Sequence, residues 1–175
     1  MIINPASIVY SGSVFSNNKE YPINEEEQLQ QHGIDLRVEK IYSLQGELFM
    51  GKEIRNLPAM KELTSIHGVF ELCALQPYQL EMIEEVSVPE NACALVIMRS
   101  TFNRGGVPIF SALFDAGYKN KIMITSYPFM DCKIEKGARV AQIIFMEAHA
   151  YKLYNGVYQG KEEDRNKPII KTVRI

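Results

Sequence analysis

The residues best suited to chemistry in this chain are a carboxylate and an aromatic ring three positions apart, Asp115 and Tyr118. Arg99 and Ser100 precede them, and the amide Gln142 follows. A carboxylate takes a proton from water, a flat ring covers a sugar, and guanidinium, hydroxyl and amide groups donate to phosphate oxygens. These residue types together are what a nucleotide phosphate site requires.

Each residue also has a simpler structural interpretation when taken alone. Asp115 with Gly117 two positions later is turn chemistry that closes a hairpin. Arg99-Ser100 is compatible with a surface ion pair and a helix cap, and a lone Tyr on a strand is usually a packing residue. Gln142 lies in an apolar run, where a buried amide must be hydrogen-bonded, so a structural and a phosphate-binding role remain equally open.

Short strands separated by Gly and Pro turns must position these residues. After Gly33, the alternation of Ile34, Leu36 and Val38 with polar residues predicts a half-buried strand. Further strands are predicted over residues 69–74, 78–88, 92–98, 121–127 and 139–148.

The remaining segments predict little regular structure. Asn4-Pro5 is a good helix start, with Asn as the cap, and predicts a short helix through about Tyr10. Residues 16–31 are polar and predict an exposed loop with a helical turn, and residues 46–65 predict an irregular excursion. Many short strands with few helices favour an all-β sandwich or jelly roll.

Length and composition support one domain. A chain of 175 residues with 46% hydrophobic residues buries a proper core. We expect one domain over residues 1–160 and a charged tail over residues 161–175, flexible or ordered on ligand binding. A net charge of −2 argues against a nucleic-acid-coating protein, and no apolar stretch is long enough for a membrane helix.

Three cysteines at positions 73, 93 and 132 form no Cys-x-x-Cys pair and predict reduced thiols in a cytoplasmic protein. The start of the chain shows no basic and apolar leader, so we expect no signal peptide. Zinc-deaminase motifs and a P-loop are both absent from the sequence.

Five motifs taken in order resemble the dCTP deaminase/dUTPase superfamily, closest to the deaminase and archaeal or viral dUTPase branch. They cover residues 32–37, 99–104, 115–119, 136–142 and 154–160, the last being Tyr154-Asn155-Gly156-Val157-Tyr158-Gln159-Gly160. The resemblance implies a distorted jelly roll with minor helices and a dUTPase-like fold. It also implies a homotrimer with shared active sites, a deoxypyrimidine nucleoside triphosphate as substrate, and Mg²⁺ bound through the triphosphate.

The resemblance also implies roles for individual residues. Asp115 would orient the attacking water, Tyr118 would exclude ribonucleotides, and Asp35 would support the hydrated metal through water. Contacts to the substrate would come from Arg99, Ser100, Thr101, Arg104, Tyr118, Gln142, Tyr158 and Gln159.

Two departures from the family pattern bear on activity. Thr125 stands where deaminases carry the glutamate that activates water at cytosine C4, and a threonine hydroxyl cannot replace that base. Val157 stands where relatives often have a Lys, so Lys161 or Arg165 would have to supply that charge.

The sequence therefore predicts a dUTP diphosphatase that releases dUMP and pyrophosphate. Two alternatives remain open at this point. One is a dCTP deaminase that uses a different base, and the other is a non-catalytic nucleotide-binding or regulatory member of the family.

Overall fold

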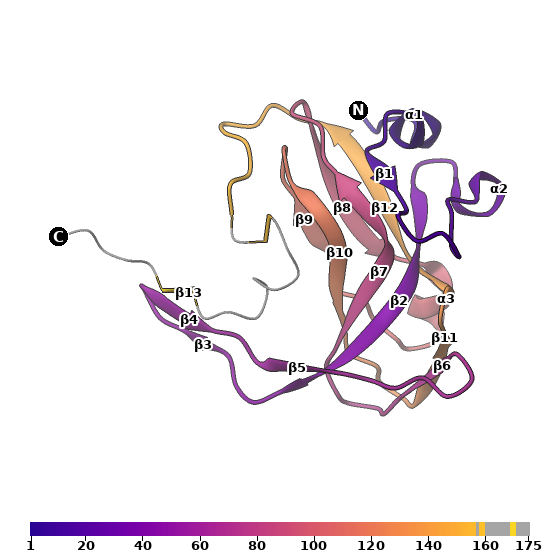
Figure 1. Cartoon of the computed structure of the whole chain (residues 1–175), viewed down its shortest axis with the longest axis vertical. Helices are drawn as coiled ribbons and strands as arrows, with labels where there is room; N and C mark the ends of the chain where they lie inside the picture. Colours follow the sequence, from indigo (N-terminus) through magenta and orange to yellow (C-terminus); the bar gives the residue numbers. More distant parts are fainter. Residues whose placement is uncertain (157, 160–168, 171–175) are drawn as a thin grey trace.

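Two antiparallel layers that share one long strand form the body of the protein (Figure 1). The computed structural model describes residues 1–156 and 158–159, together with the backbone of residues 169–170. Strands account for 46% of the structure and helices for 9%. This confirms the prediction of an all-β fold with minor helices.

The first layer runs through four strands in the order β2, β12, β8, β9. Their bounds are Ile34–Gln45 for β2, Arg139–Glu147 for β12, Ala92–Met98 for β8 and Ala112–Phe114 for β9. Phe114 of β9 pairs with Ala94 of β8, so the end of β9 lies beside the beginning of β8.

The second layer is built around β7. Strand β10 pairs with one edge of β7, while β2 and β1 follow each other along the other edge. Strand β5 extends this layer by pairing with the far end of β2. The bounds are Val14–Phe15 for β1, Ala59–Glu62 for β5, Tyr78–Ser87 for β7 and Lys119–Ser126 for β10.

Strand β2 passes from one layer to the other. Its residues 34–37 pair with β12, and its residues 38–43 pair with β7, with a register shift between Val38 and Lys40. A strand that changes layers at an irregularity is how a sandwich turns its corner. The distorted jelly roll expected from the sequence is present.

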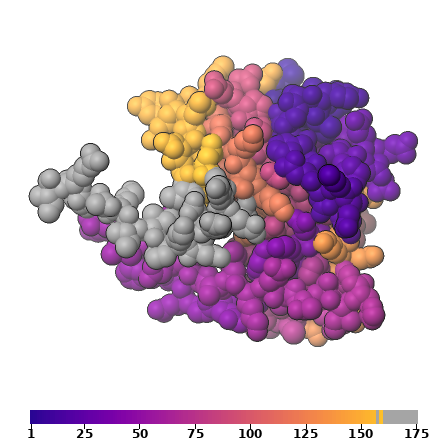
Figure 2. Space-filling view, viewed as in Figure 1, coloured from indigo at the N-terminus to yellow at the C-terminus, as the bar shows by residue number. Residues whose placement is uncertain are grey.

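Two small sheets and three helices complete the described structure. Strand β6 (Val69–Leu72) pairs with β11 (Cys132–Glu135), and β3 (Phe49–Met50), β4 (Ile54–Asn56) and β13 (Ile169–Ile170) form a three-stranded sheet. The helices are α1 (Pro5–Tyr10), α2 (Glu25–Gln28) and α3 (Ser100–Arg104). In Figure 2 the N-terminal segment with α1 and α2 covers one side of the body, and the segment with β3 to β5 lies along its lower edge.

Aliphatic side chains from both layers fill the core. Leu36, Ile41, Leu80, Ile122 and Ile143 are completely or almost completely buried. Burying such a side chain contributes about 1.5–3 kcal/mol relative to leaving it in water. The core is continuous from β2 and β12 through β7 and β10, and it fixes the strands whose ends carry the site residues.

Most predicted strands are confirmed to within a few residues, as is the N-terminal helix. In α1 the Asn4 side chain accepts a hydrogen bond from the Ala6 N–H at 2.9 Å, which is the predicted cap. The predicted strand over residues 92–98 coincides with β8.

Two expectations were wrong, and a third was right except for one buried residue. Residues 46–65 form β3, β4 and β5 rather than an irregular excursion, and β9 and β11 were not foreseen. The strand after Gly33 is covered on both faces, since Asp35 is 1% and Arg37 9% exposed. The 16–31 segment is mostly exposed and carries the expected helical turn, α2, but Gln28 at the end of that turn is completely buried.

No helix in the described part of the chain is long and apolar enough to span a membrane. The predicted tail, residues 161–175, lies outside the described residues except for the backbone of residues 169–170 in β13.

Candidate active site

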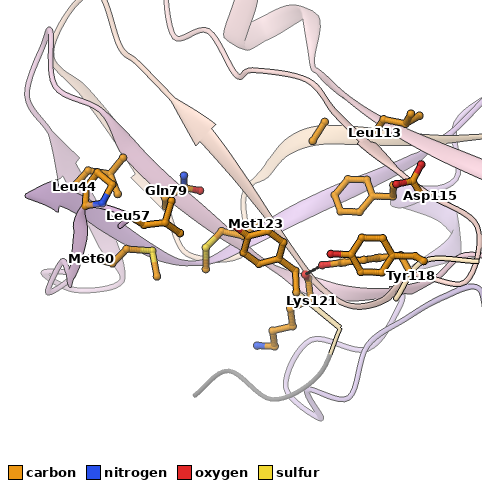
Figure 3. A pocket seen from close by; sticks show the side chains of 14 residues that line it. Leu44, Leu57, Met60, Gln79, Leu113, Asp115, Tyr118, Lys121 and Met123 are labelled. Carbon is orange, nitrogen blue, oxygen red and sulfur yellow. Dashed lines mark hydrogen bonds between the residues drawn. The ribbon is translucent and has the colours of Figure 1, made fainter. Parts of the chain in front are cut away.

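A cavity of about 530 Å³ lies beside the turn that joins β9 to β10 (Figure 3). Asp115 and Tyr118 line one end of it, as Figure 3 shows, and Leu44 and Met60 line the other. The remaining described lining residues are Leu57, Pro58, Gln79, Ala112, Leu113, Phe114, Lys121, Met123, Tyr154 and Tyr158.

Asp115 sits at the start of a tight turn with its side chain exposed. The Tyr118 N–H donates to the Asp115 carbonyl oxygen at 3.0 Å, so the predicted turn is present. Gly117 has φ +84°, a left-handed conformation that strains other residues. Within the described residues no cation pairs with the Asp115 carboxylate, which leaves it available to a water molecule in the cavity.

Tyr118 is mostly buried, with 9% exposure, and lines the cavity. Its ring packs edge-on against Phe114 at 5.1 Å and Tyr154 at 5.3 Å between centroids. Its hydroxyl donates to the Lys121 carbonyl oxygen at 3.2 Å. The ring is therefore a fixed wall of the cavity. Tyr154, which belongs to the last of the five motifs, packs against it.

Tyr154, Tyr158 and Gln159 lie against the β9–β10 turn and the start of β10. The Tyr154 N–H donates to Ala116 at 2.8 Å, and the Gln159 side chain donates to the Gly117 carbonyl at 2.9 Å. Asn120 donates to the Tyr158 carbonyl at 2.8 Å. Tyr158 and Gln159 thus lie beside Asp115 and Tyr118 in one chain. The departure at Val157, and the cations Lys161 and Arg165, lie outside the described residues.

Lys121 is a charged lining residue that the sequence did not single out. Its ammonium group forms ion pairs with Glu39 and, at 3.3 Å, with Glu81. Burial alone would lower the pKa of Lys121, but the two carboxylates outweigh it and raise that pKa above the ordinary value. The lysine is therefore held by acids beneath the cavity.

A second cluster of predicted residues is centred on Asp35. The Arg99 Nε lies 3.2 Å from one carboxylate oxygen of Asp35, and the Gln142 Nε2 donates to the other at 3.2 Å. Arg139 approaches the first oxygen at 3.5 Å. Burial raises the pKa of Asp35, and Arg99, Gln142 and Arg139 oppose that rise. Asp35 acts as the common anchor that orients these donors.

Gly33 explains how Gln142 comes close to this anchor. A Cβ at position 33 would lie 2.7 Å from the Gln142 Cγ and 2.7 Å from the Ile143 carbonyl oxygen. Both distances are shorter than normal contacts, so only glycine fits here. The half-buried Gln142 amide donates to Asp35, which is the structural role left open by the sequence.

The position of Asp35 differs from that expected of a carboxylate supporting a hydrated metal. Its side chain is 1% exposed and its oxygens face two guanidinium groups and an amide. In the described residues no three His, Cys, Asp or Glu side chains gather as a metal site. An Mg²⁺ held by protein ligands does not fit this cluster, because the guanidinium groups of Arg99 and Arg139 already pair with the Asp35 carboxylate.

Ser100, Thr101 and Arg104 lie on the short helix α3, directly after β8, and are exposed. Arg99 is the residue before the helix, and it makes no side-chain cap. Its guanidinium donates to the Arg139 carbonyl at 3.1 Å and is fixed in place by Asp35. Arg99, Ser100 and Thr101 therefore present donors at one end of β8.

The two clusters stand at opposite ends of β8. Phe114, next to Asp115, pairs with Ala94, and Arg99 follows Ala94 by five residues. Five residues of strand span about 17 Å. A single chain therefore does not bring Arg99, Ser100 and Gln142 to Asp115 and Tyr118.

Thr125, at the position of the deaminase glutamate, lies on β10 opposite Gln79 of β7. The Gln79 Nε2 donates to the Thr125 hydroxyl at 2.8 Å. Gln79 lines the cavity, and no motif in the sequence drew attention to it, because it is one polar residue in the predicted strand 78–88.

Comparison with known proteins gives a consistent family assignment. Residues 16–148 match the dCTP deaminase-like family. A probable deoxyuridine 5'-triphosphate nucleotidohydrolase from Methanopyrus kandleri is 36% identical over 79% of this chain and 92% of its own length. The deoxyuridine 5'-triphosphate nucleotidohydrolase from Methanocaldococcus jannaschii is 35% identical over 78% of this chain and 90% of its own length.

Solved structures confirm the predicted dUTPase-like fold. The 2'-deoxycytidine 5'-triphosphate deaminase from Agrobacterium tumefaciens superposes with a TM-score of 0.67 at 18% identity, over 85% of this chain and 48% of that one. A dUTPase from phage phi11 of S. aureus, described with a structural Mg(II) ion, superposes with a TM-score of 0.55 at 13% identity. It matches 82% of this chain and 94% of the phage protein. The chain belongs to the dCTP deaminase-like family, within the superfamily that joins dCTP deaminases and dUTPases.

Proposed function

We propose that this protein hydrolyses dUTP to dUMP and pyrophosphate. The observation that carries the proposal is the exposed Asp115 carboxylate at the end of a cavity walled by Tyr118. The curated relatives at 35–36% identity bear the name of dUTP nucleotidohydrolases, which supports the same reaction.

In the proposed reaction Asp115 accepts a proton from a water molecule in the cavity. The water oxygen forms a bond to the α-phosphorus, the bond from that phosphorus to the bridging oxygen breaks, and pyrophosphate leaves. A positioned carboxylate of this kind contributes about 10²–10⁴-fold to the rate. Tyr118, fixed by Phe114 and Tyr154, would hold the sugar and exclude a 2'-hydroxyl.

The phosphate-binding groups come from the Asp35 cluster. Arg99 would donate its remaining guanidinium hydrogens to the triphosphate, with Ser100, Thr101 and Arg104 on the exposed face of α3. The Gln142 amide would add a second donor beside Arg99 while Asp35 holds both in place. Such preorganised donors stabilise developing charge without reorganising during the reaction.

Mg²⁺ would enter with the triphosphate. Since the Asp35 cluster does not fit a protein-held cation, the ligands would be phosphate oxygens and water, which magnesium prefers. When bound, the ion would neutralise charge on the polyphosphate.

A second copy of the chain would complete the site. Asp115 and Arg99 lie at opposite ends of β8, so Arg99 of one copy would face Asp115 of another, as in the homotrimer that the family resemblance implies. Strand β9 carries Leu113 at 58% exposure, and Phe110 before it is 55% exposed. Exposed apolar side chains at a sheet edge are typical of a surface that another protein chain covers.

We also propose a cytoplasmic location, since the three cysteines are free thiols.

A panel of deoxynucleoside and ribonucleoside triphosphates with Mg²⁺, with products separated by chromatography, tests the proposal. We expect dUMP and pyrophosphate from dUTP, and no dUTP from dCTP, because Thr125 replaces the deaminase glutamate. Formation of dUTP from dCTP would show a deaminase, and tight dUTP binding without pyrophosphate release would show a binding protein.

A further inference from the structure

Gln79 brings a neutral amide to the apolar end of the cavity. It lies on β7, pairs with Thr125 of β10 and is half-buried. In Figure 3 its amide lies among Leu44, Leu57 and Met123, at the far end from Asp115. It is the one amide among the described residues that line this cavity.

The Gln79 amide has hydrogen-bonding groups without a partner among the described residues. The Nε2 donates one hydrogen to the Thr125 hydroxyl at 2.8 Å. An amide also has a second Nε2 hydrogen and an Oε1 acceptor. Within the described residues neither has a partner, so the structure leaves an adjacent donor and acceptor for a ligand in the cavity.

The surroundings favour a flat, weakly polar group at this position. Leu44, Leu57, Met60 and Met123 supply apolar walls, and the Lys121 charge is paired with Glu39 and Glu81. The catalytic carboxylate stands at the opposite end beside Tyr118. A nucleotide with its α-phosphate near Asp115 and its sugar near Tyr118 would direct its base towards Gln79.

We infer that Gln79 is a specificity-determining residue that reads the imide edge of uracil. Its Oε1 accepts the N3–H of the base, and its free Nε2 hydrogen donates to the O4 carbonyl. Thr125 holds this orientation by accepting the other Nε2 hydrogen. Cytosine presents an acceptor at N3 and an amine at C4, which opposes the same amide. This inference rests on the proposed function and names how that site selects its base.

The experiment compares Gln79→Met with the control Gln45→Met, which removes an exposed amide at the end of β2. Methionine keeps the length of the side chain and loses both hydrogen bonds. We expect kcat/KM for dUTP to fall about tenfold or more, because buried polar edges of the substrate lose their partners. The same parameter for dCTP should change little, so the preference for dUTP falls. The control should retain wild-type values.

A second variant keeps the inference testable if Gln79→Met folds poorly in thermal unfolding. Gln79→Glu places a carboxylate against O4 of uracil and offers an acceptor to the cytosine amine. Its preference should move towards dCTP in a binding titration. An unchanged ratio of dUTP to dCTP affinity in both variants would overturn the role of Gln79.

Titration with the non-hydrolysable α,β-imido analogue of dUTP separates this inference from the proposed function. If the wild type binds the analogue without hydrolysing dUTP, and Gln79→Met weakens that binding about tenfold or more, the base-reading role stands and the hydrolase does not. If the wild type hydrolyses dUTP and Gln79→Met keeps full affinity and selectivity, the hydrolase stands and the base-reading role is wrong.

Discussion

Arg37 and Glu84 form a buried ion pair in which Arg37 donates from both its side chain and its backbone. The Arg37 Nε lies 2.7 Å from one oxygen of Glu84, and the Arg37 backbone N–H donates to the other at 2.8 Å. Gln28 adds a third hydrogen bond to Glu84, also at 2.8 Å. The Glu84 side chain is completely buried and that of Arg37 is 10% exposed. These bonds tie α2 and β2 to β7.

Replacement of Arg37 by Met should strongly destabilise the protein. The substitution leaves Glu84 buried with its charge unpaired, and such a loss costs about 3–5 kcal/mol. Chemical denaturation of wild type and variant at one protein concentration measures the difference. Lys133→Met serves as the control, because the Lys133–Glu71 pair is 70% and 60% exposed and should leave the midpoint unchanged. An equal effect of both substitutions would contradict the importance of burial here.

Asp115→Asn should abolish turnover and leave nucleotide binding largely intact. Asparagine has nearly the same shape and preserves the turn, but it cannot accept the proton from water. We expect kcat to fall by about 10²–10⁴-fold. Pyrophosphate release reports kcat, and titration with the imido analogue of dUTP reports affinity. Substantial remaining turnover would mean that Asp115 is only a turn residue.

Two inactive variants should restore activity when combined. Asp115→Asn leaves the Arg99 end of β8 intact, and Arg99→Ala leaves the Asp115 end intact. If copies share their sites, mixed oligomers contain some complete sites. The variants are unfolded, mixed and refolded together, and pyrophosphate release from dUTP is compared with each variant refolded alone. No gain over the separate variants would indicate that one chain makes its own site.

The contribution of Lys121 to stability should depend on pH at both extremes. Burial alone would raise the pKa of Glu39, but Lys121, Asn18 and Lys136 hold it below 4.5, so this carboxyl loses its stabilising effect as the pH falls below about 4.5. Burial alone would lower the pKa of Lys121, but Glu39 and Glu81 raise it above 10.5, so its effect is lost above about 10.5.

The measurement is the difference in Tm between wild type and Lys121→Met across the pH range. We expect a constant difference between those two limits and a smaller one outside them. A difference that does not vary with pH would show that the charge of Lys121 does not stabilise the fold.

Long strands with clear periodicity were predictable, and short or tertiary features were not. Ala92–Met98 is a continuous apolar run between turn signals, and its bounds were correct. Phe49–Met50 and Ile54–Asn56 are too short to show alternation, and they are strands only because they pair with each other. The burial of Gln28 could not be foreseen, since its partner Glu84 is 56 residues away along the chain.

In the candidate site, too, local features were predictable from the sequence and tertiary contacts were not. The identities of Asp115, Tyr118 and Arg99 followed from ordered motifs, and the turn at Asp115 was correct. The grouping of Asp35 with Arg99 and Gln142 is a matter of register between β2, β8 and β12, which no local pattern encodes. Gln79 reaches the cavity only because β7 lies next to β10.

The burial of both faces at the start of β2, from Ile34 to Val38, gives its charged residues a part in selecting the correct fold. A slip by one residue would exchange the two faces of the strand. Burial of hydrophobic groups would oppose such a slip only weakly, because Leu36 and Val38 would still be covered on the other side. Glu84 would then meet an aliphatic side chain instead of Arg37, and Arg99 would lose Asp35. The buried ion pairs thus specify the native register of β2 and disfavour compact misfolded states in which the strand has slipped.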